Sequence, residues 1–410
     1  MNILLNPIGS RGDIQPMIAL GQYLQERGHT VRVAGSPNGA TLAKCYGLAF
    51  YGIGFNIQKE LENQKESIDN PIRVYRMFKT LIKQAIHDQF AELTPHIEWA
   101  DVVLAGGVTL ATYSLCEAKG KAFRYIAYCP QLVPSNDHPV IFFPFVRLPK
   151  WINHCIWRTG IRLLRSGLRE HFLLSRNKLG LETTSSIEKY IFPDTKIIYA
   201  IDECIVPLAA DLQPAVSTGY LYLPQPRALP EKLLSFIEAG DPPFYIGFGS
   251  MTDQAPLQTT RIILQAAKEV GVRVIIGRGW AKLGMQNMPP FAYLVDTVSH
   301  ESLFPRMAGI VHHGGAGTTA AAARAGRPQA IIPHLLDQFY WADRIERLQV
   351  GPKGFWKRRL TIQKMATLFE EFTSGDYETK AQEIGGRLQR RNGLLEAATY
   401  IEKMFPSSSS

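Results

Sequence analysis

Short apolar runs of β-type residues alternate along the chain with longer segments that carry apolar residues at helical spacing. In the first half these runs are Ile3–Leu5, Val31–Ala34, Val102–Ala105, Tyr125–Tyr128 and Ile197–Ile201, and in the second half Phe244–Phe248, Val272–Ile276, Tyr293–Val295, Gly309–Val311 and Ala330–Ile332. Strands that alternate with helices form parallel sheets covered by helices on both faces. The pattern therefore predicts an α/β protein with two doubly wound, Rossmann-like domains.

The proline-rich stretch Asp211–Pro230 has few periodic apolar positions and separates the two series of strands. We therefore expect a first domain over residues 1–210, a linker over 211–230, a second domain over 231–385 and a C-terminal helix within 386–406. The polar segment Asn56–Asn70 predicts an exposed loop, and Ser407–Ser410 predicts an unpacked tail. Two such sheets facing each other leave a cleft at the carboxyl ends of their strands, where ligands bind.

The composition is that of a globular protein, since 46% of the 410 residues are hydrophobic and 20% are charged. The net charge of +9 is compatible with binding to nucleic acid, to an anionic membrane surface or to a phosphorylated substrate, and it does not distinguish among these partners. The five cysteines are far apart and form no CxxC pair, which favours a reducing cytoplasm over a disulfide framework or a zinc site. The first residues are typical of a strand and not of a signal peptide, and no apolar run approaches the ~20 residues that span a bilayer.

The strongest local signal is the segment 309–326, GIVHHGGAGTTAAAARAG, in which a strand-like run leads into a glycine-rich turn and an alanine-rich helix. Gly315 and Gly317 permit close approach of the backbone to a ligand. Thr318 lies near the helix start, where free N–H groups and the helix dipole favour an anion. A histidine before the turn adds a hydrogen-bond donor, so the turn predicts a phosphate site. The alternative is a plain strand–helix turn with a capping threonine.

A second functional interpretation of this turn is a dinucleotide fingerprint. The stretch 315–320 fits GxGxxA, and Asp337 follows about twenty residues later, as in an NAD site. Against this, Pro333 interrupts the strand before Asp337, and Gln338 follows directly. An acid–amide pair on a loop suits the several hydroxyls of a sugar as well as a single ribose. From these residues alone, both interpretations stay open.

The stretch HHGGAGTTAAAARAGRPQAIIPHLLDQFYWADRI, residues 312–345, resembles the donor-binding signature of the family-1 glycosyltransferases, which have the GT-B fold. It is most similar to that of the sterol glucosyltransferases and the antibiotic-aglycone glycosyltransferases. The resemblance implies that Asp337 and Gln338 contact the donor sugar and that the final helical pattern, Leu394–Phe405, packs back onto the N-terminal domain. It also implies that the donor diphosphate contacts His312, His313, Gly315, Gly317 and Thr318.

Other residues of the second half fit the same resemblance. Ser250 ends a strand in a turn similar to the family's Gly-Ser turn at the phosphate, and an ordinary β-turn is the alternative. Trp280 follows the next strand and would stack near the nucleobase or else fill the core. Val298 and Ser299 correspond to positions that contact the base.

Residues 6–16, NPIGSRGDIQP, follow the first strand and precede a helix. They resemble the GSRGDxxP loop of the same families, which implies that Asp13 is the general base; many plant and animal relatives carry histidine in this loop instead. An attacking hydroxyl needs such a group to take its proton. The alternative is that Asp13 caps the helix, although Pro16 would then occupy the third helical position with no N–H to donate.

Residues 140–172 join an aromatic-rich loop to an amphipathic helix with a basic stripe formed by Arg158, Arg162, Arg165 and Arg169. We expect Gly12 of the first loop, together with Phe142, Phe143 and Trp157, to line a pocket for a hydrophobic acceptor. The basic stripe favours a surface that rests on anionic lipid. A core-packed helix with a solvated basic face is the equal alternative.

The resemblance implies an inverting enzyme that moves a sugar to a hydroxyl of a sterol, polyketide or lipid. The default donor is UDP-glucose, and a dTDP-sugar is the alternative. No two aspartates are separated by a single residue and the ten histidines form no HxH or HxxxH pair, so no metal cofactor is expected. The alternatives are an NAD-dependent oxidoreductase and a non-catalytic nucleotide-sugar or lipid-binding protein. No nucleic-acid-binding module appears, and we expect a cytoplasmic protein, either free or at the inner face of a membrane.

Overall fold

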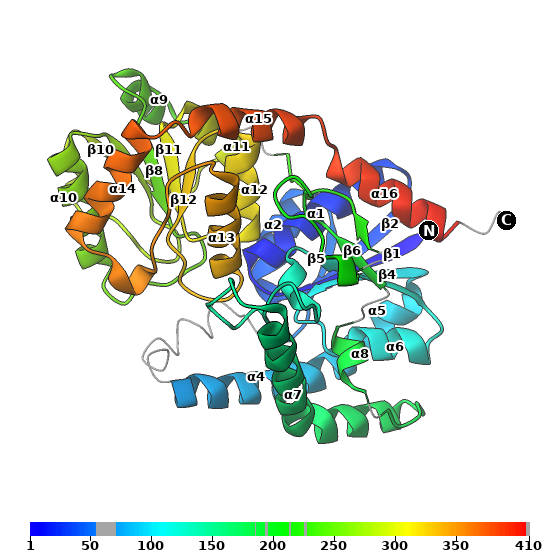
Figure 1. Cartoon of the computed structure of the whole chain (residues 1–410). Helices are drawn as coiled ribbons and strands as arrows, with labels where there is room; N and C mark the ends of the chain where they lie inside the picture. The colour runs from blue at the N-terminus through cyan, green and yellow to red at the C-terminus, as the bar shows by residue number, and fades with distance from the viewer. Residues whose placement is uncertain (55–70, 185, 193–195, 213–214, 225–227, 407–410) are drawn as a thin grey trace.

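The computed structural model describes residues 1–410 except 55–70, 185, 193–195, 213–214, 225–227 and 407–410, and it leaves out the side chains of residues 71–79 and 81–82 (Figure 1). The predicted loop Asn56–Asn70 and the predicted tail Ser407–Ser410 lie outside the described residues. The described residues form two parallel sheets with helices packed around each of them.

The N-terminal sheet has seven strands in the order β3-β2-β1-β4-β5-β6-β7, and every neighbouring pair is parallel. The strands are β1 (Asn2–Ile8), β2 (Thr30–Gly35), β3 (Ala49–Gly52), β4 (Val102–Gly107), β5 (Ala122–Ala127), β6 (Ile197–Tyr199) and β7 (Val216–Ser217). The central strands β1 and β4 are buried along almost their whole length, because helices cover both of their faces.

The C-terminal sheet has five parallel strands in the order β10-β9-β8-β11-β12. They are β8 (Phe244–Gly247), β9 (Val274–Gly277), β10 (Ala292–Val295), β11 (Gly309–His312) and β12 (Gln329–Ile331). In both sheets the order reverses direction beside the first strand, and such a switch point opens a crevice at the carboxyl ends of the strands.

The helices that pack around the N-terminal sheet and the cleft are α1 (Arg11–Glu26), α2 (Ala40–Cys45), α4 (Pro71–Glu92), α5 (Thr94–Trp99), α6 (Thr112–Ala118), α7 (Lys150–Lys178) and α8 (Glu188–Ile191). The second half contributes α9 (Glu231–Glu238), α10 (Pro256–Val270), α11 (His300–Leu303), α12 (Ala316–Arg324), α13 (Gln338–Leu348), α14 (Ile362–Ser374), α15 (Glu378–Gln389) and α16 (Gly393–Met404). The helices α4 and α7 pack against each other and project from the N-terminal half, at the bottom of the view in Figure 1.

Every strand-like run of the sequence coincides with a strand of one of the two sheets, which confirms the doubly wound α/β fold. The pattern did not predict β3, because this edge strand is mostly exposed and has no buried apolar run. It also did not predict β7, which has two residues and lies within the stretch 211–230 that was interpreted as a linker. There β7 adds an edge to the N-terminal sheet by pairing with β6. The domain boundaries themselves stay a prediction.

The last helix, α16, leaves the C-terminal half and lies against α1 of the N-terminal half (Figure 1). Its residues Ala397 and Ile401 are fully buried and belong to the same hydrophobic cluster as Leu24 of α1. At the end of this contact, Glu402 accepts a hydrogen bond of 2.6 Å from Arg27 Nη2. The chain therefore passes between the halves twice, once after β7 and once before α16.

The halves also touch along α13. Arg147 of the N-terminal half forms ion pairs with Asp343 at 2.5 Å and with Glu346 at 2.8 Å. Arg344 Nε donates a hydrogen bond of 2.9 Å to the carbonyl oxygen of Ile205. These contacts fix the second sheet against the loops of the first.

Substitution of Ile401 tests how far α16 stabilises the N-terminal half. Ile401→Ala leaves a cavity in a fully buried contact, so we expect the free energy of unfolding to fall by about 2–5 kcal/mol. Lys403→Ala, on the exposed side of the same helix, should change it by less than about 0.5 kcal/mol. Denaturant unfolding of both variants gives the comparison. Equal effects would mean that α16 is not part of the folded core.

Candidate active site

A large cavity lies between the two sheets, with a volume of about 2250 Å³. It is lined by the loops that follow β1, β4, β5, β8, β9, β10, β11 and β12, and along one side by α7. These loops meet because the carboxyl ends of the strands in each parallel sheet lie at one edge. Every residue that the sequence predicted for the site lines this cavity, with the exception of His312.

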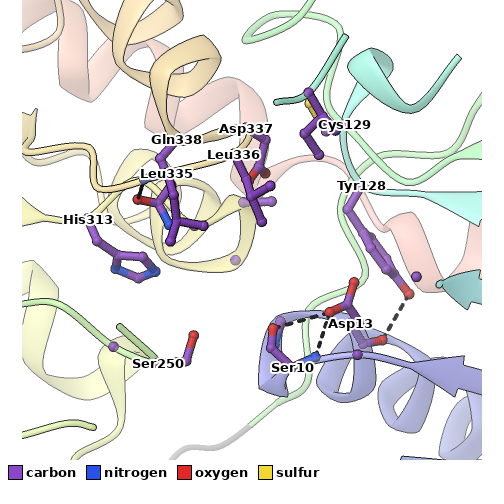
Figure 2. A pocket seen from close by; sticks show the side chains of 18 of the residues that line it. Ser10, Asp13, Tyr128, Cys129, Ser250, His313, Leu335, Leu336, Asp337 and Gln338 are labelled. Carbon is purple, nitrogen blue, oxygen red and sulfur yellow. Dashed lines mark hydrogen bonds between the residues drawn. The ribbon is translucent and has the colours of Figure 1, made fainter. Parts of the chain in front are cut away.

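Asp13 lies in the first turn of α1 and faces the cavity (Figure 2). Ser10 is the N-cap of this helix, and Asp13 accepts hydrogen bonds from its backbone N–H at 2.8 Å and from its hydroxyl at 3.1 Å. The interpretation of Asp13 as an N-cap, with Pro16 at the third helical position, is therefore wrong. The helix begins at Arg11, so Asp13 is itself the third residue and closes a capping box with Ser10.

Two glycines make room for the Asp13 carboxylate. A Cβ atom at Gly9 would lie 2.1 Å from Asp13 Oδ2, and one at Gly107 would lie 3.3 Å from Oδ1. Gly107 also has φ +77°, which favours glycine. Tyr128 Oη donates a hydrogen bond of 3.4 Å to the backbone carbonyl oxygen of Asp13. Burial of the carboxyl group raises the pKa of Asp13 to about 6, although the Ser10 hydrogen bonds act in the opposite direction.

The two histidines at the end of β11 have different surroundings. His312 is fully buried, and its Nδ1 accepts a hydrogen bond of 3.1 Å from the Gly314 N–H. Its Nε2 must then carry the proton, which it donates to Gln329 Oε1 at 2.9 Å. Both ring nitrogens are thus used to hold the turn, and the structure does not bring His312 to the cavity as the sequence predicted.

His313 faces the cavity from the other side of the turn (Figure 2). Its ring lies between two glycines, since a Cβ atom at Gly249 or at Gly315 would be 2.6 Å from a ring atom. Among the described residues, its buried Nδ1 has no hydrogen-bond partner. Burial holds the pKa of His313 well below its usual value, so the imidazole is neutral and presents one N–H donor.

The first turn of α12 opens onto the same part of the cavity. Gly315 is the N-cap, and residues 316–318 line the cavity wall. The N–H groups at a helix start have no partner within the helix and carry a partial positive charge. The side chain of Thr319 is turned away, because its hydroxyl donates a hydrogen bond of 3.0 Å to the Gly315 carbonyl oxygen. The turn therefore offers backbone donors to an anion.

Asp337 is the N-cap of α13, at the end of the loop that follows β12 and opposite Asp13, and Gln338 is the first residue of that helix (Figure 2). Asp337 Oδ2 accepts a hydrogen bond of 2.9 Å from Trp341 Nε1. Burial, and to a lesser degree the charge of Asp13, raise the pKa of Asp337 to about 6. The Gln338 side-chain oxygen instead stabilises the loop before α13, because it accepts hydrogen bonds from the His334 N–H at 2.7 Å and the Leu335 N–H at 3.1 Å.

The other predicted donor-site residues lie on neighbouring loops of the C-terminal half. Ser250 and Trp280 line the cavity on two loops that are joined by a hydrogen bond of 2.9 Å from the Trp280 N–H to the Gly249 carbonyl oxygen. Val298 and Ser299 line it next to the start of α11. The Ser299 hydroxyl caps that short helix by accepting a hydrogen bond of 3.3 Å from the Ser302 N–H.

The N-terminal half supplies an apolar wall. Gly12, Phe142, Phe143 and Trp157 line it, as predicted for the acceptor pocket. Trp157 is only 4% exposed, and its Nε1 donates a hydrogen bond of 2.9 Å to the His138 carbonyl oxygen. Trp157 thus supports the wall from the core, whereas Phe142 is 64% exposed at its edge.

The basic stripe of α7 points away from this wall. Arg158, Arg162 and Arg169 are exposed, whereas Arg165 pairs with Glu188. No helix among the described residues is long and apolar enough to cross a membrane. Contact of the stripe with anionic lipid stays a prediction.

Each half of the chain matches a known protein family. Residues 3–107 match the family described as glycosyltransferase family 28 N-terminal domain, and residues 261–384 match the family described as erythromycin biosynthesis protein CIII-like, C-terminal domain. A vancomycin aglycone glucosyltransferase of Amycolatopsis orientalis is 32% identical over 86% of this chain and 85% of its own length. A sterol 3-beta-glucosyltransferase of Arabidopsis thaliana is 30% identical over 99% of this chain and 68% of its own.

The chain is a family-1 glycosyltransferase.

Solved structures agree on the fold of this glycosyltransferase. The glycosyltransferase VinC in complex with dTDP superimposes with a TM-score of 0.71 at 20% identity, and 99% of each chain is covered. The glycosyltransferase of kitacinnamycin gives a TM-score of 0.75 at 16% identity, again over 99% of each chain. At these identities the likeness shows the GT-B fold alone. Membership of an enzyme family removes both the oxidoreductase interpretation of the glycine-rich turn and the interpretation as a non-catalytic binding protein.

The sequence did not identify several residues of the glycosyltransferase cavity. Tyr128 follows β5, so the rule that sites form at strand carboxyl ends was sufficient to find it. Tyr220 and Tyr222 lie in the proline-rich stretch after β7, where no periodic pattern marks them. Leu336 lines the cavity with φ +56°, which is rare for a residue with a side chain and has no signature in the sequence.

Gly249→Ala tests the packing around His313. The new Cβ would lie 2.6 Å from the His313 ring, at a residue with φ +55°, so we expect the free energy of unfolding to fall by roughly 2 kcal/mol or more. Gly240→Ala is the matched control in the same half, because its nearest neighbour would be Arg273 Nη1 at an ordinary 3.5 Å. Denaturant unfolding measures both. If Gly249→Ala leaves the free energy of unfolding unchanged, the His313 ring does not need this space.

Proposed function

We propose that this glycosyltransferase moves a sugar from a nucleotide-diphosphate donor to a hydroxyl of a hydrophobic acceptor, with inversion at the anomeric carbon and without a metal ion. The observation that carries the proposal is the placement of Asp13 across the cavity from the start of α12 and from His313. Sugar transfer with inversion needs a proton acceptor for the attacking hydroxyl and an anion site for the departing diphosphate.

The donor end of the proposed site is the first turn of α12. Backbone N–H groups of residues 316–318 and the His313 N–H would bind the diphosphate, and Ser250 lies on the facing loop. Asp337 would accept hydrogen bonds from the sugar hydroxyls. Trp280 and Val298 would hold the nucleobase at the far end. UDP-glucose is the proposed donor, and a dTDP-sugar is the alternative.

The chemistry assigned to Asp13 is proton removal. The acceptor oxygen forms a bond to the anomeric carbon while Asp13 takes the hydroxyl proton, and the bond from that carbon to the β-phosphate oxygen breaks. The nucleoside diphosphate leaves from the face opposite the attack, so the configuration inverts. The negative charge that grows on the leaving oxygen is stabilised by the α12 N–H groups, which are already in place and need no rearrangement.

Asp13→Asn is the direct test. We expect transfer to fall by about 100-fold or more, because general-base catalysis contributes about 10²–10⁴, while UDP continues to raise the melting temperature. The wild type should lose kcat/KM as the pH falls through about 6, the pKa of Asp13, since only the ionised carboxylate takes a proton. Kinetics across pH 5–8 with a panel of hydrophobic alcohols, together with thermal shifts for UDP and dTDP, give both readouts.

Asp337→Asn is the control for the pH profile, since the pKa of Asp337 is also raised to about 6. This variant should transfer sugar more slowly but keep the loss of activity below pH 6, shifted slightly to lower pH because one neighbouring negative charge is gone. If neither UDP nor dTDP stabilises the wild type, the proposed function fails. A fully active Asp13→Asn would remove the general base from it.

For the acceptor, we propose an apolar alcohol that lies along α7. Ile156, Gly160 and Leu164 recur at intervals of four on the cavity side of this helix, where none of the lining residues of α7 is charged. A Cβ atom at Gly160 would meet no atom within 4 Å, so the cavity is open at this point. The relatives named for sterols and for the vancomycin aglycone support a bulky acceptor.

Gly160→Leu should narrow this wall. We expect KM for a bulky acceptor to rise about 10-fold or more, because its apolar body loses buried contact area, while UDP affinity stays unchanged. Ser166→Leu is the matched control, since Ser166 is exposed on the same helix and does not line the cavity. Steady-state kinetics against the acceptor measures both. Equal behaviour of the two variants would place the acceptor elsewhere.

A further inference from the structure

Tyr220 lies in the segment that joins the two sheets, and it lines the cavity. Its backbone is held from both sides. The Tyr220 N–H donates a hydrogen bond of 3.1 Å to Asp202 Oδ2, and a Cβ atom at Gly393 would lie 2.5 Å from the Tyr220 carbonyl oxygen. Its ring packs edge-on against Tyr222, with 5.0 Å between the ring centroids. The position of the side chain is thus fixed by its neighbours.

The Tyr220 hydroxyl points at the first turn of α12. A Cβ atom at Gly317 would lie 2.5 Å from Tyr220 Oη, so only a glycine lets the phenol come this close. The side chain is 9% exposed, and among the described residues its hydroxyl has no hydrogen-bond partner. The neighbouring Tyr222, which also reaches α12, does have one, since its hydroxyl donates a hydrogen bond of 3.1 Å to the Ala320 carbonyl oxygen.

An unpartnered phenol beside unpaired helix N–H groups has the chemistry of a phosphate ligand. Burial, helped by the nearby charge of Asp13, holds the pKa of Tyr220 above its ordinary value, so the hydroxyl keeps its proton and can donate it. The hydroxyl belongs to a side chain that lines the cavity, so a ligand oxygen can reach it. A phosphate oxygen at the α12 turn would satisfy the hydroxyl and the N–H groups together.

We propose that the Tyr220 hydroxyl donates a hydrogen bond to the donor diphosphate at the first turn of α12. This inference rests on the proposed function, and it adds a ligand from the segment between the halves to those of the C-terminal half. In the ground state the bond contributes to donor affinity. As the sugar leaves, charge builds up on the diphosphate and the same bond strengthens.

Tyr220→Phe removes the hydroxyl and keeps the ring. We expect UDP to bind about 10- to 100-fold more weakly, as for a hydrogen bond to a charged group, while uridine, which has no phosphate, binds as it does to the wild type. Isothermal titration with UDP and uridine measures the two affinities; dTDP and thymidine replace them if the wild type prefers thymine. Tyr400→Phe is the control, since Tyr400 lies on α16 and does not line the cavity, and it should change neither affinity.

The outcomes separate this inference from the function on which it rests. A wild type that binds neither UDP nor dTDP overturns both. If the wild type binds UDP and Tyr220→Phe binds it equally well, the Tyr220 contact alone is wrong. Equal losses of UDP and uridine would also overturn it, because they would indicate a disturbed fold and not a lost phosphate contact.

Discussion

The unpaired N–H groups at the start of α12 are the constraint around which the cavity is arranged. A helix cannot satisfy these donors internally, and here they face a cavity and not bulk solvent. The space for an anion is kept open by residues without side chains: Gly249 and Gly315 flank the His313 ring, and Gly317 faces the Tyr220 hydroxyl. Each glycine leaves room for a polar group to approach the same turn.

The polar groups of the cavity differ in charge. The α12 turn presents partial positive charge, whereas Asp13 of the N-terminal half and Asp337 of the C-terminal half present two carboxyl groups, close enough for the charge of Asp13 to raise the pKa of Asp337. His313 and Tyr220 beside this turn are uncharged, because burial keeps the imidazole neutral and the phenol protonated. The positive end of the helix dipole favours a reaction in which negative charge develops on a group bound at this turn.

The fold was largely readable from the sequence, because buried parallel strands leave apolar runs that need no tertiary information to detect. The edge strands β3 and β7 were missed for the same reason, since neither is buried. Among the site residues, His312 was predicted as a phosphate ligand because the motif carries two adjacent histidines. Which ring faces the cavity depends on Gln329, a partner seventeen residues away that no local pattern marks.

The residues between the halves were the least predictable. Tyr220 depends on Asp202 and Gly393 for its position, and these three residues belong to different parts of the chain. The sequence offered only a proline-rich stretch there, with no period to interpret. Asp13 was partly predictable. Its loop was recognisable in the sequence, but its place in the capping box depended on where the helix begins.

The two passages of the chain between the halves lie side by side. Arg391, just before α16, donates a hydrogen bond of 3.4 Å to the Ser217 carbonyl oxygen of β7, and Gly393 presses on Tyr220. Because the two passages touch at Tyr220 and Gly393, a substitution at either residue acts on both connections between the halves at once.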